Sequence, residues 1–177
     1  MNIFLTIIII GISLSMDAFS LALIYGTYNI KNKDIFLLSS IVGIFHFFMP
    51  LMGLTFGSFI SRYFIFNVNL VVGVIFGIIG IEMVISSIKK EDVNILFGMV
   101  GFLLFGLSVS IDSFTTGIGL SLIGNNYLLC SFVFMIISSF FTFIGLVFGN
   151  KLSQRFGSFA TTVGGIFMLL IAIFYFI

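Results

Sequence analysis

Six long apolar runs, separated by short polar segments, constrain the fold of this chain more than any other feature of its sequence. They cover residues 3–25, 36–60, 70–88, 95–123, 127–149 and 158–176. A helix of about 20 apolar residues is long enough to cross the hydrocarbon core of a bilayer. The 177 residues are 60% hydrophobic and 7% charged, so a water-soluble fold would lack the polar side chains needed to cover its surface. We therefore predict an all-α integral membrane protein whose six transmembrane helices form a single domain over residues 1–177.

The same composition excludes several classes of function. A formal net charge of +1 provides no basic surface for binding nucleic acid. Cys130 is the only cysteine, which excludes an internal disulfide and a thiolate metal cluster. The sequence contains no nucleophile beside a base, no phosphate-binding loop and no spaced His/Cys cluster, so we expect neither an enzyme nor a bound cofactor.

The Lys and Arg residues predict the orientation of the chain, because short cytoplasmic loops are enriched in positive charge. Loops one, three and five hold six of the seven, namely Lys31, Lys33, Lys89, Lys90, Lys151 and Arg155. Only Arg62 lies in an even-numbered loop. We predict a multi-pass protein of the cell membrane whose odd-numbered loops are cytoplasmic and whose termini are both extracytoplasmic.

The two halves of the sequence, residues 1–90 and 95–177, resemble each other. GISLSMDAF at 11–19 aligns with GLSVSIDSF at 106–114, and GLTFG at 53–57 aligns with GLVFG at 145–149. Each half contains three spans, an odd number, so the second half enters the membrane from the opposite side. The sequence therefore predicts two inverted three-helix repeats, which many secondary transporters use to build a substrate site near the bilayer midplane.

Three acidic residues lie inside predicted spans: Asp17, Glu82 and Asp112. An aspartate at the centre of a membrane helix disfavours insertion by about 2.5–3.5 kcal/mol. Asp17 and Asp112 occupy aligned positions in the two halves, which favours a functional role. The structural alternative is a protonated carboxyl group that is hydrogen-bonded to serine or to the backbone.

Hydroxyl side chains share a helix face with each aspartate, because residues three and four apart are neighbours on a helix. The two faces consist of Ser13, Asp17 and Ser20 in the first span, and of Ser108, Asp112, Thr115 and Thr116 in the fourth. Carboxylate, hydroxyl and carbonyl oxygens suit hard divalent cations such as Mn²⁺ or Mg²⁺. We predict an all-oxygen ion site between the first and fourth spans.

Two further residues are candidates for this site. Pro50 cannot donate to the carbonyl of His46 and displaces it, so His46 offers either its imidazole or its carbonyl oxygen to a cation, or a route for protons. The alternative for His46 is a kinked helix in which the ring bonds a neighbouring serine. Glu82 has no acidic counterpart in the sixth span, and roles in the site, in a gate and in snorkelling to the interface are all open.

Three motifs carry a resemblance to a known family: SMDAF at 15–19, FHFFMPLMG at 45–53 and SIDSFTTGIG at 110–119. They resemble the "putative manganese efflux pump" (MntP) family over essentially the whole chain. The resemblance implies a bacterial inner-membrane exporter of Mn²⁺ with Asp17 and Asp112 on the transport path. The chain departs from the family pattern at His46, where members often carry Glu or Gln.

Residues and resemblance together lead to one hypothesis and its alternatives. The hypothesis is a secondary exporter whose transported substrate, Mn²⁺, moves out of the cytoplasm. Because the chain has no ATP-binding motif, we expect export to be coupled to protons or to the membrane potential. The bilayer and the ion are its expected partners. The alternatives are a non-transporting membrane protein of sporulation or assembly, and an exporter of another divalent cation.

Overall fold

The computed structural model describes residues 3–28, 30–63, 67–88, 98–122, 126–149 and 154–176. They form the helices α1 (Ile3–Gly26), α2 (Asn32–Tyr63), α3 (Val68–Ile88), α4 (Met99–Ser108), α5 (Ile111–Ser121), α6 (Tyr127–Phe148) and α7 (Gln154–Phe176). Six stretches are long and apolar enough to cross a membrane, and α4 and α5 together form the fourth. The predicted all-α fold with six transmembrane helices is confirmed, and the described ranges contain no strand.

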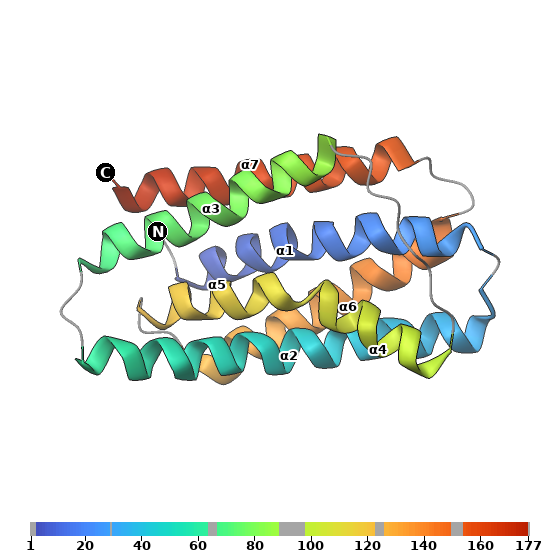
Figure 1. Cartoon of the computed structure of the whole chain (residues 1–177), viewed down its shortest axis with the longest axis horizontal. Coiled ribbons are helices and arrows are strands. Elements are labelled where there is room, and N and C mark those ends of the chain that lie inside the picture. Colours follow the sequence, from blue (N-terminus) through green and yellow to red (C-terminus); the bar gives the residue numbers. More distant parts are fainter. Residues whose placement is uncertain are drawn as a thin grey trace.

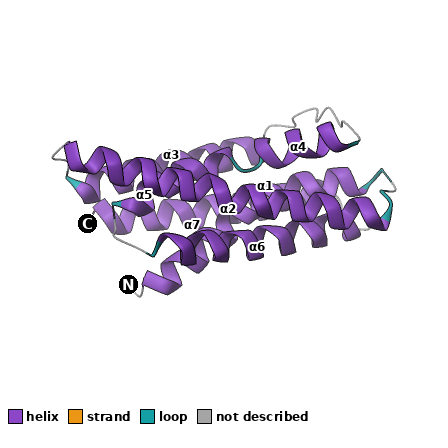
Figure 2. Ribbon diagram, turned by 90° about the horizontal axis from the view of Figure 1, so that it is seen from below, coloured by secondary structure: helices purple, strands orange, loops and turns teal. Residues whose placement is uncertain are grey.

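The fourth span is interrupted, whereas the apolar run over 95–123 predicts one helix. α4 ends at Ser108 and α5 begins at Ile111, and Figure 2 shows a short loop between them. The amide of Ser110 bonds the carbonyl of Leu107, three residues back, at 3.2 Å instead of continuing the α-helical ladder. The Ser110 hydroxyl donates to the same carbonyl at 3.0 Å, and such local side-chain bonds compete with helical backbone bonds.

The helices lie roughly side by side in a flattened bundle (Figure 1). α3 and α7 form a layer on one side of α1, and α2, α4, α5 and α6 lie on its other side. α1 packs against α6 and α7, α2 packs against α4, α5 and α6, and α3 packs against α7 and α5. α1 begins and α7 ends at the same end of the bundle, and the turn from α1 to α2 lies at the opposite end.

Glycines allow two of these helix pairs to approach closely. A Cβ at Gly53 of α2 would collide with the carbonyl group of Phe114 on α5. A Cβ at Gly145 of α6 would lie 2.9 Å from the carbonyl oxygen of Phe19 on α1. Gly53 aligns with Gly145 in the sequence, and Phe114 aligns with Phe19, so the α2–α5 and α1–α6 contacts follow one pattern.

Buried apolar side chains form two large clusters in opposite halves of the bundle. The terminal cluster lies where α1 begins and joins six helices: Ile7, Ile10, Leu14, Leu54, Val72, Phe76, Ile79, Met83, Leu120, Cys130, Phe134, Met168, Ile171 and Ala172. The turn-side cluster lies toward the α1–α2 turn and joins α1, α2, α4 and α6, with Val109: Ala18, Ala22, Tyr25, Ile35, Leu38, Ile41, Val42, Phe102, Phe105, Val109 and Leu146. It includes no residue of α3 or α7. α7 is linked to α1 in this half by the smaller cluster of Phe19, Leu23 and Ala160.

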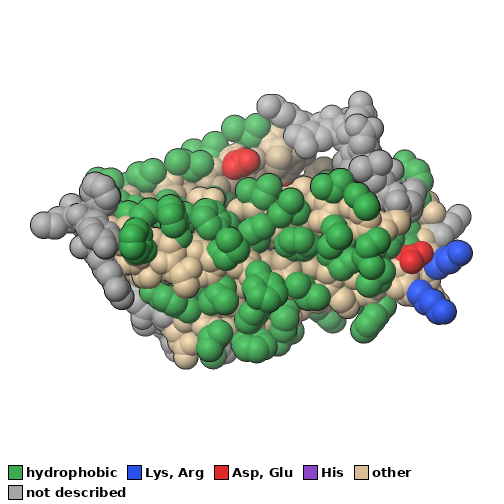
Figure 3. Space-filling view, turned by 60° about the horizontal axis from the view of Figure 1, so that its bottom comes forward, with side chains coloured by type: hydrophobic (Ala, Val, Ile, Leu, Met, Phe, Trp, Pro, Cys, Tyr) green, Lys and Arg blue, Asp and Glu red, His purple; other side chains and the backbone are tan. Residues whose placement is uncertain are grey.

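The outer surface of the bundle is apolar, as a bilayer requires. Large hydrophobic side chains are exposed on every spanning helix, and Figure 3 shows them covering one face. Lysine and arginine side chains are visible at one end of this face (Figure 3), and Lys31 and Lys33 are exposed beside the α1–α2 turn. Lys89, Lys90 and Lys151, which also support the predicted orientation, lie outside the described residues together with positions 95–97 and 123 of the predicted fourth span.

Candidate ion-binding site

The first half of the candidate site is a polar face of α1. Because α1 is uninterrupted, Ser13, Asp17 and Ser20 share a face as the sequence predicts. Asp17 is partly buried, and Ser13 is fully buried with its hydroxyl donating to the carbonyl of Ile9 at 2.9 Å. Ser20 lies against α7, where a Cβ at Gly157 would come within 2.8 Å of its hydroxyl oxygen. The end of this face at Ser20 therefore lies against α7.

The second half of the site is the start of α5. Asp112 is the second residue of that helix and is partly buried. Its Oδ1 accepts a hydrogen bond from the backbone N–H of Ser113 at 2.8 Å. The first N–H groups of a helix have no intrahelical acceptor and carry partial positive charge, which stabilises a carboxylate there. The interruption of the fourth span thus sets Asp112 at a helix N-terminus inside the membrane.

The three carboxyl groups inside the membrane come from three different helices. The charges of both Asp17 and Glu82 act on Asp112. Glu82, on α3, is exposed, whereas the two aspartates are only partly accessible. Like charges repel strongly in a low-dielectric medium, so this acidic cluster of Asp17, Glu82 and Asp112 favours a bound cation. In the described part of the chain no three His, Cys, Asp or Glu side chains are close enough to hold one metal ion together.

Two hydroxyl residues of the predicted fourth-span face are separated by the helix interruption. Ser108 is exposed at the end of α4, and its hydroxyl donates to the carbonyl of Phe105 at 2.9 Å. Asp112 belongs to α5, so the four-residue spacing does not place it above Ser108 on one helix face. Thr116 is fully buried in α5, and its Oγ1 has no hydrogen-bond partner among the described residues.

His46 is fully buried on α2. Its Nδ1 lies 3.0 Å from the carbonyl oxygen of Val42, and its Nε2 has no hydrogen-bond partner in the ranges that the structure describes. The ring therefore bonds the backbone of its own helix and not a serine. α2 continues as one helix through Pro50, whose carbonyl lies directly against Gly117 of α5.

Sequence reasoning missed a set of buried hydroxyl groups between the helices. Ser15 of α1 and Ser138 of α6 are both fully buried, and their hydroxyl oxygens lie 2.9 Å apart. Ser113, Ser131 and Thr142 are also fully buried, and their hydroxyls have no partner within the described residues. Ser15 could have been found from the repeat, since it aligns with Ser110, and Ser113 lies within the SIDSF motif. The hydroxyl residues of α6 lie in an apolar run with no distinguishing pattern.

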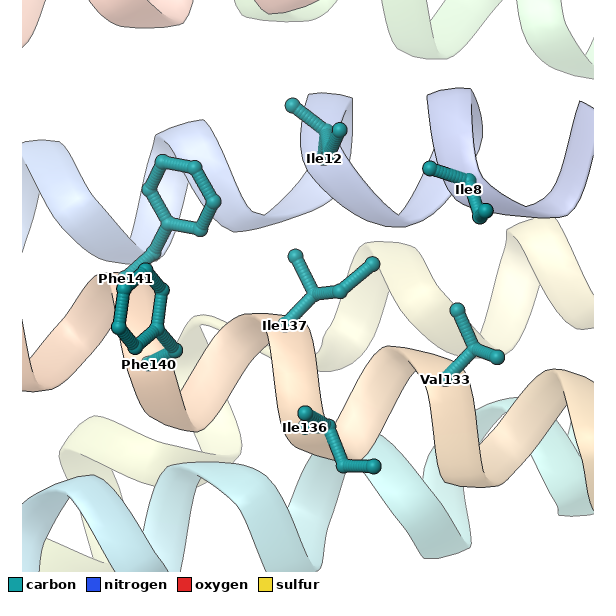
Figure 4. Close-up of a pocket in the computed structure, with 7 residues that line it drawn as sticks. All are labelled: Ile8, Ile12, Val133, Ile136, Ile137, Phe140 and Phe141. Atoms are coloured by element: carbon teal, nitrogen blue, oxygen red, sulfur yellow. The ribbon is translucent and has the colours of Figure 1, made fainter. Parts of the chain in front are cut away.

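A groove of about 400 Å³ lies between α1 and α6, away from the acidic cluster. Its lining is entirely apolar: Ile8, Ile12, Val133, Ile136, Ile137, Phe140 and Phe141 (Figure 4). Apolar cavities of this kind stay dry and offer no oxygen ligand to an ion. The groove is therefore not part of the candidate ion site.

Comparison with known proteins yields one family and a set of relatives. The family model described as "Putative manganese efflux pump" matches residues 29–176. The chain is 34% identical over 166 residues to a protein of Bacillus pumilus (strain SAFR-032), covering 93% of this chain and 90% of the relative. It is 35% identical over 162 residues to one of Geobacillus thermodenitrificans (strain NG80-2), covering 91% and 88%. Both relatives are named "Putative manganese efflux pump MntP". No solved structure matches the chain.

Proposed function

The chain belongs to the MntP family of manganese efflux pumps, and we propose that it exports Mn²⁺ from the cytoplasm as a secondary transporter. The observation that carries this proposal beyond family membership is the acidic cluster. Three carboxyl groups within one membrane domain are unfavourable unless a cation or protons neutralise them. Carboxylate oxygens are ligands that Mn²⁺ prefers.

We assign the ion site to Asp17 and Asp112. Both lie part way through a span, and the hydrogen bond from the Ser113 amide orients one Oδ of Asp112 and leaves the other oxygen available. Glu82 is exposed and lies six residues before the end of α3, so it serves to attract the cation on its way to the aspartates. The two aspartates then bind Mn²⁺ together with hydroxyl or water oxygens.

The packing supports access to this site from the cytoplasm. If the odd-numbered loops are cytoplasmic, the half of the bundle with the turn-side cluster faces the cytoplasm. That cluster includes no residue of α3, which carries Glu82, whereas the terminal cluster packs six helices together on the opposite side. We infer that this conformation binds the ion from the cytoplasm and that the terminal cluster closes the outer side.

The inverted repeat supplies the second conformation of the transport cycle. The matching contacts of Gly53 with Phe114 and of Gly145 with Phe19 are what two repeats related by a pseudo-twofold axis would produce. In such transporters the two halves exchange conformations, which moves the opening from one side of the membrane to the other. Uphill export then requires coupling to protons or to the membrane potential.

Metal accumulation in cells tests the proposal. The chain is expressed in manganese-sensitive bacteria that lack their own exporter, and intracellular Mn, Fe, Zn and Cd are measured. We expect wild type to lower Mn and the Asp17→Asn variant to leave it high. Asp34→Asn is the matched control, because this carboxyl group lies in the first turn of α2, at the end of the span. Equal Mn in cells with wild type and with Asp17→Asn would reject the proposal, and a fall in Cd alone would correct the ion.

A further inference from the structure

The seam between α2 and α5 contains polar groups that the proposed ion site does not use. His46 of α2 and Ser113 and Thr116 of α5 are each fully buried. Each has one polar atom without a hydrogen-bond partner among the described residues: Nε2 of His46, Oγ of Ser113 and Oγ1 of Thr116. Buried polar atoms in native proteins are nearly always paired with protein, water or an ion. Such atoms on two helices that pack against each other indicate a site for a small polar species.

The contacts between the two helices place His46 and Ser113 on facing sides of the seam. α2 and α5 run in the same direction, since Gly53 lies against Phe114 and Gly57 lies against Ile118. Gly117 lies against Pro50. His46 precedes Pro50 by one helical turn and Ser113 precedes Gly117 by one turn, so both residues lie on the sides of α2 and α5 that face each other.

The hydrogen bond to the backbone defines which nitrogen of the ring is available. The carbonyl oxygen of Val42 can only accept, so Nδ1, 3.0 Å away, carries the hydrogen of the neutral imidazole. Nε2 then holds the lone pair. This nitrogen is an acceptor with no donor, and a proton is the smallest species that it can bind.

The helices packed against α2 supply few groups that compete with the ring for a proton. α4 has no titratable side chain, and the described part of α6 has Tyr127 and Cys130. Asp112 is the only ionisable residue of α5. His46 is the only histidine of the chain and the only basic side chain that the structure places away from the span ends.

We propose that Nε2 of His46 is the proton-carrying group that couples Mn²⁺ export to proton entry, an inference that rests on the proposed function. With the aspartates empty, Nε2 accepts one proton from water on the outer side, while Nδ1–H keeps its bond to Val42. The hydroxyls of Ser113 and Thr116 accept the hydrogen bond of the new N–H. The proton passes to cytoplasmic water before Mn²⁺ binds, because two cationic species close together in a low-dielectric medium repel strongly. Because the proton and Mn²⁺ are not bound at the same time, proton entry and Mn²⁺ export alternate.

Proteoliposomes with a pH-sensitive dye inside test the coupling. Mn²⁺ flux and proton flux are measured in the same vesicles for wild type, for His46→Gln and for the control Thr142→Val. Glutamine retains an N–H donor but cannot accept a proton, and Thr142 is another buried, unpartnered hydroxyl on α6. We expect His46→Gln to move Mn²⁺ down its gradient while proton flux falls to the level of vesicles without protein. We expect Thr142→Val to keep the wild-type ratio of protons to Mn²⁺.

The outcomes separate this inference from the function on which it rests. Wild type that moves no Mn²⁺ would reject the export proposal itself. Wild type that moves Mn²⁺ without protons, or His46→Gln with a wild-type ratio, would overturn the coupling role alone. A fall of the ratio in Thr142→Val as large as in His46→Gln would also overturn it, because general loss of buried polarity would then explain the effect.

A second measurement needs no variant. His46 is the only histidine, so ¹⁵N-histidine labelling of protein purified with a histidine-free tag reports on this ring alone. We expect a neutral ring with hydrogen on Nδ1 at high pH and a second hydrogen on Nε2 after acidification. A ring with hydrogen on Nε2 throughout, or one whose nitrogen shifts do not respond to pH, would contradict the proposal.

Discussion

Carboxyl groups at the centre of a membrane helix each disfavour insertion by about 2.5–3.5 kcal/mol, so their surroundings must stabilise them. The carboxylate of Asp112 accepts a hydrogen bond from the backbone N–H of Ser113 and lies at the N-terminus of α5. These groups offset part of the cost of placing a negative charge there. At the residue scale, the interruption of the fourth span therefore supplies the backbone N–H groups that stabilise the carboxylate of Asp112.

Close contacts at glycine give a prediction about stability. Gly117→Ala should lower the melting temperature in detergent by about 3–10 °C, since overpacking typically costs about 1–3 kcal/mol. The added Cβ would collide with the carbonyl of Pro50 on α2. Gly77→Ala is the control, because its Cβ would meet only the Cβ of Ala172, at an ordinary 3.8 Å. It should melt at or above the wild-type temperature. Equal melting temperatures for the two variants would contradict the α2–α5 packing.

The sequence identifies the candidate carboxylates but not all of their setting. Asp17 and Asp112 stand out because each interrupts an apolar run and because the motif occurs in both halves. The orphaned Nε2 of His46 and the buried Ser113 could not be predicted, since hydroxyl residues are common in membrane helices and their partners come from other helices. Side-chain pairing of this kind depends on tertiary contacts.

At the scale of elements, the interrupted fourth span shows where local sequence is insufficient. The aligned segment of α1 has the same serine pattern, and Ser13 and Ser15 bond the carbonyls four residues back, Ile9 and Gly11, within an unbroken helix. Ser108 and Ser110 bond carbonyls three residues back, and the helix breaks. Aligned segments that share five of nine residues thus adopt two backbone conformations, and packing against different neighbours must decide between them.

Separation of α3 from α5 is the element-scale movement that the export cycle requires on the outer side. A Cβ at Gly119 of α5 would lie 3.3 Å from Cγ2 of Ile75 on α3. A disulfide between Ile75→Cys and Gly119→Cys, in a Cys130→Ser background, should therefore form and stop Mn²⁺ export. Reduction with dithiothreitol should restore it, and intracellular Mn is the readout.

A cross-link between α3 and α7 is the matched control for this experiment. The Cβ positions of Gly77 and Ala172 lie 3.8 Å apart, close to the usual separation in a disulfide. Because α3 and α7 pack together along their length, we expect the pair Gly77→Cys and Ala172→Cys to cross-link and leave export intact. If the protein with the Ile75→Cys and Gly119→Cys disulfide intact still exports Mn²⁺, the contact between α3 and α5 does not open during export.

At the scale of the whole molecule, apolar run length and loop charge were sufficient to predict the number of spans. The described part of the structure has six helical stretches that are long and apolar enough to cross a membrane, as predicted. The prediction succeeds because a chain segment in a bilayer must satisfy its own backbone hydrogen bonds, and a helix of about 20 apolar residues does so. The packing order of the helices could not be derived in this way, since large apolar side chains occur on both the lipid-facing and the protein-facing sides of these helices. Orientation in the membrane remains a prediction.

Labelling of single cysteines tests that orientation. In a Cys130→Ser background, Asn126→Cys should react with a membrane-impermeant maleimide added to intact cells, and Asn32→Cys should react only after the membrane is opened. Both residues are exposed at span ends and lie at opposite ends of the bundle. The reverse pattern would place the termini in the cytoplasm and invert the proposed direction of access.

Mn²⁺ uptake by inside-out membrane vesicles tests the central claim most directly, because the cytoplasmic face then meets the added ion. We expect vesicles with wild type or Asp34→Asn to accumulate Mn²⁺, and we expect Asp112→Asn to lower uptake by about tenfold or more by removing a charged ligand. The Asn side chain retains an acceptor for the Ser113 amide, so the fold should persist. Wild-type uptake by Asp112→Asn, at equal amounts of folded protein, would contradict the account.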